Sequence, residues 1–389
     1  MPWREVSIME QRREFVELFR QEGANRRELC RRFGVHPSIG YKWLERWQSE
    51  GELADRSRRP HASPLRTDAE VEGRIVALRD AHPAWGARKL ARCLEREGMA
   101  CPACSTVHEI LRRHGRITAP AGGVRATHRF EMAAPNLIWQ MDFKGHRPLS
   151  GGGRCHPLTI IDDHSRYAVC LKACADEQGG TVQGHLEATF RRHGLPEAFF
   201  VDNGGPWGDA SGTPWTRLGV WLLKLGVRVL HSRPYHPQSR GKNERFHRTL
   251  ESEVFALAHF RDLAEAQRAF DRWRSIYNCE RPHQALGQDV PASRYRPSAR
   301  PMPQRLAQPQ YDEHEIVRTV STTKSYISFR GRPWPVPHAF CGERLAVRPL
   351  ARDGHYGVFF AAHHIATINL TSQQCVGDVS EQVSLMSPG

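Results

Sequence analysis

A change of hydrophobic period at residue 136 constrains the fold of this 389-residue chain more than any other feature. Before it, apolar residues recur at helical spacing; after it they alternate, as on strands. The alternating runs predict strands over 137–144, 156–161, 167–173, 198–201 and 227–231. Helices are expected over 181–193 and 241–259. The order β-β-β-α-β-α-β-α predicts a mixed five-stranded sheet with helices packed on it.

The first 50 residues predict a helix-turn-helix DNA-binding domain, because Gly23 and Gly34 separate short helices. Asn25 and Glu28 have the spacing of a capping box for a helix over 26–33. On the helix that follows, four exposed side chains are expected to contact bases and phosphates: Ser38, Tyr41, Lys42 and Arg46. A plain three-helix bundle is the alternative interpretation.

A second helix-turn-helix domain is expected over 67–130, where apolar residues again keep helical spacing. Ser105 is expected to cap its last helix, on which Arg112 and Arg113 are exposed and available to DNA. Residues 51–66 are rich in Arg and Pro and predict a basic linker between the two domains.

The last quarter of the chain predicts a linker and a small β domain. Residues 289–311 are rich in Pro and Arg with little apolar content, which is typical of a linker. Short alternating runs over 312–370, punctuated by Pro and Gly, predict a small β-barrel. Residues 371–389 are rich in Ser and Gln and are expected to form a disordered tail. Taken whole, the sequence predicts a multidomain α+β protein.

Charge and composition narrow the function classes. Lys and Arg number 56 against 42 Asp and Glu, a net charge of +14, which favours a polyanionic partner such as nucleic acid. Residues 1–10 are too charged for a signal peptide, and no apolar run approaches the ~20 residues of a membrane helix. Ten Cys are too few for a disulfide scaffold. We therefore expect a cytoplasmic protein with no membrane partner.

Three carboxylates stand out by their context. Asp142 lies near the end of the first strand, Asp202 directly follows the fourth, and Glu244 lies in the first turns of a helix. On a helical wheel, that helix is expected to bury one stripe of apolar residues: Phe246, Leu250, Val254 and Leu257. Glu244 lies outside this stripe, so burial does not explain it.

Several motifs around these carboxylates resemble the integrase core of bacterial insertion-sequence transposases and retroviral integrases. They are QMDF, IDDHSR, VDNG, PYHPQSRGKNERFHRTL and YNCERPHQALGQDVPASRY, spread over roughly residues 136–296. The resemblance implies a ribonuclease-H-like catalytic core over 131–288 with a triad at Asp142, Asp202 and Glu244. The 41 residues between the last two include a surplus, which we interpret as a Gly-rich loop insertion over 207–215.

The residue types suit phosphodiester chemistry. Carboxylate oxygens are hard ligands for Mg²⁺ or Mn²⁺, and two such ions about 4 Å apart can activate a nucleophile and stabilise a leaving oxygen. The resemblance implies that Asp142 bridges two ions while Asp202 and Glu244 each hold one. Water would free a 3′-hydroxyl at the transposon end, and that hydroxyl would attack target DNA.

Other polar residues near the triad are expected to contact DNA or to shape turns. The expected contacts with the transposon end flank Glu244: Gln238, Arg240, Lys242, Arg245 and Arg248. Asp162 and Asp163 are rival metal ligands, but their place in an Asp-Asp-His-Ser-Arg turn favours capping hydrogen bonds.

Three functions remain open from the sequence. The first is a transposase that binds terminal inverted repeats, cuts there and joins the ends to target DNA, as a homo-oligomer associated with the bacterial nucleoid. The second is a transposase-derived regulator that binds the repeats without catalysis. The third is a nuclease of the same fold that cuts but does not join.

Overall fold

The computed structural model describes residues 7–56, 66–117, 131–208, 214–231 and 241–377. The chain divides into two compact units, Met1–Arg66 and Thr67–Gly389. Within the described ranges, no helix has both the length and the apolar character needed to cross a membrane.

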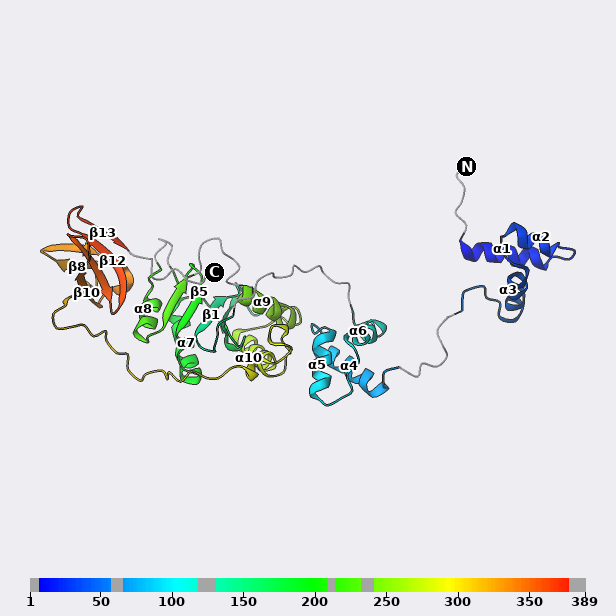
Figure 1. The fold of residues 1–389 in the computed structure, drawn as a ribbon, viewed down its shortest axis with the longest axis horizontal. Helices are drawn as coiled ribbons and strands as arrows, with labels where there is room; N and C mark the ends of the chain where they lie inside the picture. The colour runs from blue at the N-terminus through cyan, green and yellow to red at the C-terminus, as the bar shows by residue number, and fades with distance from the viewer. Residues whose placement is uncertain (1–6, 57–65, 118–130, 209–213, 232–240, 378–389) are drawn as a thin grey trace. The chain divides into compact units, whose positions relative to one another are not determined.

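The first unit is a bundle of three short helices (Figure 1). They are α1 (Ile8–Arg20), α2 (Arg26–Arg32) and α3 (Pro37–Glu50). Ser7 and Glu10 form a capping box at the start of α1, since each backbone N–H donates to the other side chain. The Asn25 side chain accepts from the Glu28 N–H at 3.2 Å, which confirms the predicted cap of α2.

Gly40 lies inside α3, where glycine costs about 1 kcal/mol relative to alanine. A Cβ there would lie 2.9 Å from the Phe15 ring and 3.0 Å from the Cys30 Sγ. Gly40 is buried, so its lack of a side chain lets α3 approach α1 and α2 closely. Close packing of the bundle explains a residue that helix propensity alone disfavours.

The second unit begins with another group of three helices. They are α4 (Ala69–Ala81), α5 (Ala87–Arg96) and α6 (Cys104–Arg113). Val71, Ile75, Leu90 and Leu94 are buried in their common core, as the helical spacing predicted. The prediction that Ser105 caps the last helix is wrong: α6 begins at Cys104, and no side chain caps it.

A six-stranded mixed sheet forms the centre of the second unit (Figure 1). Its strands are β1 (Ile138–Phe143), β2 (Arg147–Pro148), β3 (Arg154–Asp162), β4 (Ala168–Cys174), β5 (Ala198–Val201) and β6 (Arg228–His231). The order is β2-β3-β1-β5-β6, and β4 also pairs with β3. β1 is antiparallel to β3 and parallel to β5, and β5 is parallel to β6. The mixed sheet is confirmed, with the two-residue strand β2 added to the five expected.

Helices pack on both faces of this sheet. They are α7 (Gly179–His193), α8 (Arg217–Lys224), α9 (Gly241–Leu250) and α10 (Leu263–Cys279). α7 and α8 share a hydrophobic core with Trp139 and Met141 of β1. α9 and α10 share another core with Ile161 of β3 and with Ala168 and Leu171 of β4. The sheet therefore separates two helical layers, with α9 and α10 on their own face.

The helix expected over 241–259 changes form partway. α9 ends at Leu250 and continues as the π-helix η2 (Glu251–Phe255). Phe246, Leu250 and Val254 are buried as predicted, but Leu257 is 58% exposed. The π-turn alters the helical phase and the helix then ends, so Leu257 leaves the buried stripe.

Residues 289–300, expected to begin a linker, instead pack on the core. Tyr295 stacks on Tyr167 with ring centroids 4.1 Å apart, and both rings contact His193 edge-on. The Arg300 guanidinium donates to the carbonyl oxygens of Pro196, Leu225 and Gly226. We name this segment, 289–300, the strap.

The C-terminal strands form an open sheet, so the predicted barrel is not what the described residues show. Five antiparallel strands pair in the order β13-β12-β11-β10-β7: β7 (Ile316–Thr319), β10 (Arg344–Pro349), β11 (His355–Phe360), β12 (His363–Asn369) and β13 (Gln374–Gly377). A separate hairpin, β8 (Tyr326–Phe329) and β9 (Arg332–Pro335), packs its Ile327 and Trp334 into the core of that sheet. β13 lies in the expected tail, whose later residues 378–389 lie outside the described part.

α8 is shared by two hydrophobic cores. Leu218 and Leu222 face the central sheet, while Val220 and the preceding Trp215 pack into the core of the C-terminal sheet. The Trp215 ring lies 5.2 Å from Phe340, between ring centroids. One helix thus joins the central and C-terminal sheets.

We expect Gly40→Ala to destabilise the first unit by about 1–2 kcal/mol, because overpacking outweighs the gain in helix propensity. Native-state hydrogen exchange of the α1–α3 amides measures this in the full chain. Gly73→Ala is the matched control. A Cβ at Gly73, also inside a helix, meets nothing within 4 Å, so that change should stabilise α4 slightly. Equal effects of the two substitutions would contradict the packing explanation.

Acid should loosen the strap through His193. Burial lowers the pKa of His193 to about 4, whereas an exposed histidine in the unfolded chain titrates near 6.5. The unfolded chain therefore binds more protons between these values, and stability falls as pH drops from 6.5 to 4, by at most ~3 kcal/mol. Melting curves of wild type and His193→Gln test this: their stability difference should shift against the wild type on acidification, and a constant difference would contradict it.

Candidate active site

Asp142 and Asp202 occupy equivalent positions on neighbouring parallel strands. The register between β1 and β5 pairs Ile138 with Ala198 and Gln140 with Phe200, a constant offset of 60 residues. Extended by two residues, the same offset brings Asp142 opposite Asp202, directly after β5 ends. Neighbouring strands lie about 5 Å apart, so these two carboxylates share one edge of the sheet.

Side-chain alternation along β1 and β5 assigns Asp142 and Asp202 to the same face of the sheet, because Phe199 and Val201 of β5 lie in the core on the other face. Trp139 and Met141 belong to the core beneath α7 and α8. Because side chains alternate along a strand, Gln140 and Asp142 point to the opposite face. Thr159, the cross-strand partner of Asp142, shares that face. α9, which carries Glu244, packs on this same face.

Asp202 is held by its own turn and by β6. Its Oδ1 accepts from the backbone N–H of Gly204 at 3.1 Å, and its carbonyl oxygen accepts from the Nδ1 of His231 at 3.0 Å. His231 is 4% exposed, and burial lowers its pKa, which favours the neutral ring. The loop after β5 is therefore fixed at its first residues.

A hydrogen-bonded chain connects α9 to β1. The Thr159 hydroxyl donates to the carbonyl oxygen of Asp142 at 2.9 Å and lies 2.8 Å from the Nε2 of His247. Because the single hydroxyl proton is used by Asp142, His247 must donate through Nε2. His247 lies one turn after Glu244 on α9.

Glu244 is exposed and lies in the first turn of α9. Asp142 and Asp202 are only partly exposed. In the part of the chain that the structure covers, no group of three or more His, Cys, Asp or Glu is arranged to hold a metal ion. The β1–β5 register, extended by two residues, thus brings Asp142 and Asp202 to one edge of the sheet, and Glu244 lies on a helix that packs on this sheet, but the described residues form no metal-binding group.

Asp162 and Asp163 are both fully buried in the turn after β3. Asp162 accepts from the backbone N–H of Asn136 and from Ser165, whose backbone N–H and hydroxyl both donate. Asp163 accepts from Gln140 and from the ammonium of Lys242 at 2.5 Å. Each carboxylate is engaged by protein donors, as expected of a turn.

The residues expected to contact DNA differ in their surroundings. Arg245 and Arg248 are exposed on α9, whereas the Lys242 side chain is 15% exposed and paired with Asp163. Burial lowers the pKa of Lys242 to about 8, and the charge of Asp163 opposes the shift. Gln238 and Arg240 lie outside the described residues.

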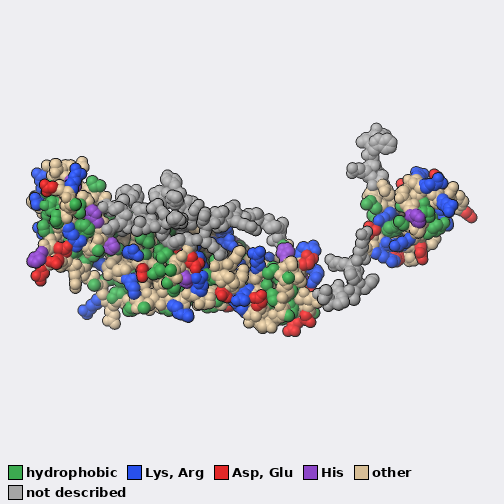
Figure 2. All heavy atoms as spheres, viewed as in Figure 1, with side chains coloured by type: hydrophobic (Ala, Val, Ile, Leu, Met, Phe, Trp, Pro, Cys, Tyr) green, Lys and Arg blue, Asp and Glu red, His purple; other side chains and the backbone are tan. Residues whose placement is uncertain are grey.

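In the helical units, Ser38, Tyr41 and Lys42 are exposed on α3. The prediction that Arg46 is exposed is wrong: its side chain is 13% exposed, pairs with Glu50 and lies over the Trp43 ring. On α6, exposed Arg112 pairs with Glu109, and Arg113 pairs with the buried Glu72. Figure 2 shows Lys and Arg interspersed with acidic residues on the visible surface of the described residues.

Thr159 and Gln140 were not singled out from the sequence, although they connect the site, whereas for His247 the sequence favours a polar or packing role over a metal role, because hard Mg²⁺ rarely takes imidazole. Thr159 and Gln140 are polar residues within strands whose neighbours are buried, and His247 follows Glu244 at helical spacing. These positions in the strands and the helix are the sequence feature that could have marked the three residues. The tertiary structure is needed to show that Thr159 lies opposite Asp142 and contacts His247.

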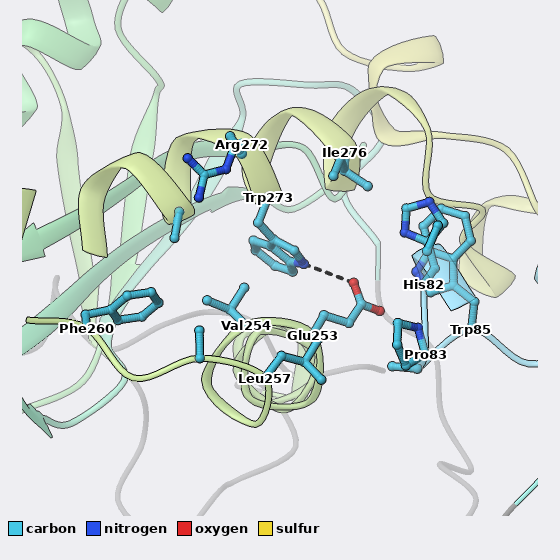
Figure 3. A pocket seen from close by; sticks show the side chains of 14 residues that line it. His82, Pro83, Trp85, Glu253, Val254, Leu257, Phe260, Arg272, Trp273 and Ile276 are labelled. Atoms are coloured by element: carbon cyan, nitrogen blue, oxygen red, sulfur yellow. Dashed lines mark hydrogen bonds between the residues drawn. The ribbon is translucent and has the colours of Figure 1, made fainter. Parts of the chain in front are cut away.

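A hollow elsewhere in the second unit does not contain the three carboxylates. It is lined by the turn between α4 and α5, by η2 and by α10 (Figure 3). Its one acid, Glu253, accepts from the Nε1 of Trp273 at 3.0 Å and from the Nε of Arg281 at 2.8 Å. The lining is otherwise mainly apolar, so this hollow does not suit phosphate or metal chemistry.

Family models match most of the chain in separate segments. Integrase core domain models match residues 132–237 and 225–291. A helix-turn-helix domain matches 11–61, a homeodomain-like domain matches 39–111, and the C-terminal domain of IS481 family transposases matches 315–375. The order of these matches follows the order of the helical units, the mixed sheet and the C-terminal sheet.

Proteins of two insertion elements are similar over more than half of the chain. A 31.7 kDa protein of IS407 from Burkholderia multivorans is 28% identical over 59% of this chain and 82% of its own length. A 39.2 kDa protein of IS476 from Xanthomonas euvesicatoria is 26% identical over 59% of this chain, which spans 66% of that relative, just under two thirds.

Retroviral proteins are also similar. The Gag-Pol polyprotein of baboon endogenous virus is 27% identical over 48% of this chain and 11% of its own length. The match to the solved catalytic core of HTLV-2 integrase in complex with magnesium has 12% sequence identity and a TM-score of 0.31, and it covers 42% of this chain and 97% of that one.

The integrase core matches contain the motifs QMDF, VDNG and GKNERFHRTL. The chain therefore combines segments that match helix-turn-helix domains, an integrase core and the C-terminal domain of IS481 family transposases, and it is similar to proteins of bacterial insertion elements.

Proposed function

We propose that this protein is a DNA transposase that cuts at the ends of an insertion sequence and joins each freed 3′-hydroxyl to target DNA. The observation that carries the proposal is the shared register and face of Asp142 and Asp202, on the side of the sheet that α9 covers. The integrase core matches support the same reaction class.

The donor chemistry of the three carboxylates fits hard divalent cations. Asp142, Asp202 and Glu244 would offer only carboxylate oxygens, the ligands that Mg²⁺ and Mn²⁺ prefer. Two such ions, when bound, would supply Lewis-acid activation of the attacking oxygen and charge stabilisation of the leaving oxygen. Ligation by all three side chains requires Glu244 to approach the pair formed by the two aspartates.

The chain's own residues would prepare the site for DNA. The pairing of β1 with β5 would bring the two aspartates to one edge of the sheet, and the Thr159–His247 contact joins α9 to β3, whose Thr159 hydroxyl also donates to the carbonyl oxygen of Asp142. Arg245 and Arg248, exposed on α9 beside Glu244, would contact the phosphates of the transposon end. The chain's backbone and side chains thereby orient the scissile phosphate.

Recognition of the terminal inverted repeats is assigned to the helical units. The exposed Ser38, Tyr41 and Lys42 lie on α3, the third helix of the first unit, where a recognition helix reads base edges. Arg112 and Arg113 of α6 would add phosphate contacts. Because two ends must be processed together, we propose that the protein acts as a homo-oligomer on DNA, in the bacterial cytoplasm.

Glu244→Gln should lower Mg²⁺-dependent joining by at least about a hundredfold, since it removes a proposed ligand and keeps the shape of the side chain. Gel shifts with the DNA that flanks the coding region should show unchanged end binding. Glu187→Gln, an acid on α7 across the sheet, is the matched control and should join normally. A wild type that binds ends without cutting would indicate the regulator, and one that cuts without joining would indicate the nuclease.

Lys42→Ala should weaken end binding and reduce the slope of log Kd against log salt by about one, as loss of one phosphate contact does. Arg46→Ala provides the comparison, because its guanidinium already pairs with Glu50 and packs on Trp43. Fluorescence anisotropy titrations at several salt concentrations measure both slopes. A slope unchanged by Lys42→Ala, or changed more by Arg46→Ala, would contradict the proposed contact surface.

A further inference from the structure

Lys242 lies two residues before Glu244 and is engaged by the protein itself. Its ammonium lies 2.5 Å from the Oδ1 of Asp163, and the two side chains are 15% and 0% exposed. Asp163 belongs to the turn after β3, so this ion pair connects the start of α9 to the central sheet. A buried carboxylate that loses its cation is strongly disfavoured, so the pair resists opening.

Asp163 continues the connection to β1. Its Oδ1 also accepts from the Nε2 of Gln140 at 2.8 Å, and its Oδ2 accepts from the backbone N–H of Met132 at 2.9 Å. Gln140 is 2% exposed and lies two residues before Asp142 on the same face of β1. A buried polar path thus runs from Lys242 through Asp163 to the strand that carries Asp142.

A second path meets α9 on the other side of Glu244. His247, three residues after Glu244, reaches the carbonyl oxygen of Asp142 through Thr159. Contacts at positions 242 and 247 fix the first turns of α9 before and after Glu244. Together they restrain rotation of α9 about its axis, and that rotation sets the direction of the Glu244 side chain.

We propose that Lys242 and Asp163 are positioning residues, which hold the Glu244 end of α9 against β1 so that Glu244 can share metal ions with Asp142 and Asp202. This inference rests on the proposed function. It replaces the expected DNA contact of Lys242 with a role inside the protein. Residues that orient metal ligands typically contribute ten- to hundredfold to metal affinity.

The variants are chosen to separate positioning from folding and from DNA binding. Lys242→Met and Asp163→Asn each break the pair, Lys242→Arg restores a cation, and the double variant Asp163→Asn/Lys242→Met removes both charges without leaving either buried alone. Lys224→Met is the matched control. Lys224 pairs with Glu343 at the same distance of 2.5 Å and is 13% exposed, but lies on α8.

Two readouts are measured on the full chain. The first is the Mg²⁺ concentration for half-maximal joining of a pre-cut end, with the joining rate at saturating Mg²⁺ and the Kd for end DNA. The second, without metal or DNA, is hydrogen exchange of the amides in 241–247. We expect the double variant to need ten- to hundredfold more Mg²⁺, with an unchanged Kd for DNA and faster exchange in 241–247. Lys242→Arg should restore most of the Mg²⁺ affinity, and Lys224→Met should match wild type.

Other outcomes overturn the inference in distinguishable ways. A weaker Kd for DNA with an unchanged Mg²⁺ requirement would return Lys242 to the DNA surface. Unchanged exchange in 241–247 would show that the pair does not restrain α9. If wild type joins no DNA at any Mg²⁺ concentration, the proposed function fails by itself. The exchange comparison between the double variant and Lys224→Met then decides whether the restraint exists.

Discussion

The parallel pairing of β1 with β5 is the constraint on which the proposed chemistry depends. The two strands are distant in sequence, and an offset of 60 residues brings Asp142 opposite Asp202. A slip of one residue would turn one carboxylate toward α7 and α8, into an apolar core. Burial of Trp139, Met141, Phe199 and Val201 on that side makes such a slip costly. Packing on one face of the sheet thereby sets the positions of the carboxylates on the other.

Much of the architecture could be predicted from local patterns. Alternation and helical spacing predicted the strands of the central sheet and most helices to within a few residues, because each element buries its own face. Features that depend on distant partners could not be predicted this way. The strap packs through Tyr295 and Arg300, whose partners lie on other elements, and its Pro-rich composition resembles a linker. Whether the C-terminal strands close into a barrel also depends on which strands pair with one another, and alternation along a single strand does not contain that information.

The candidate site also has features that local patterns predict and features that only distant contacts show. Asp142, Asp202 and Glu244 stood out through neighbouring motifs, but their surroundings come from tertiary contacts. Lys242 reads as one more cation in a basic stretch until Asp163, 79 residues earlier, is brought to its ammonium. A buried acid in a turn and a lysine beside a catalytic motif each have a plain local interpretation. The contact between Lys242 and Asp163 is the observation that indicates a common positioning role.

Because α8 packs against both the central sheet and the C-terminal sheet, the stabilities of these two sheets are coupled. Separation of the C-terminal sheet from α8 would remove the apolar neighbours of Trp215 and Val220 and break the ion pair between Lys224 and Glu343. Hydrophobic surface would then be exposed to water on α8 and on the C-terminal sheet, which is unfavourable. The C-terminal sheet therefore cannot move independently of α8 without losing these contacts. Trp215, two residues before this helix, lies in the core of the C-terminal sheet and so acts as an attachment between that sheet and the helix.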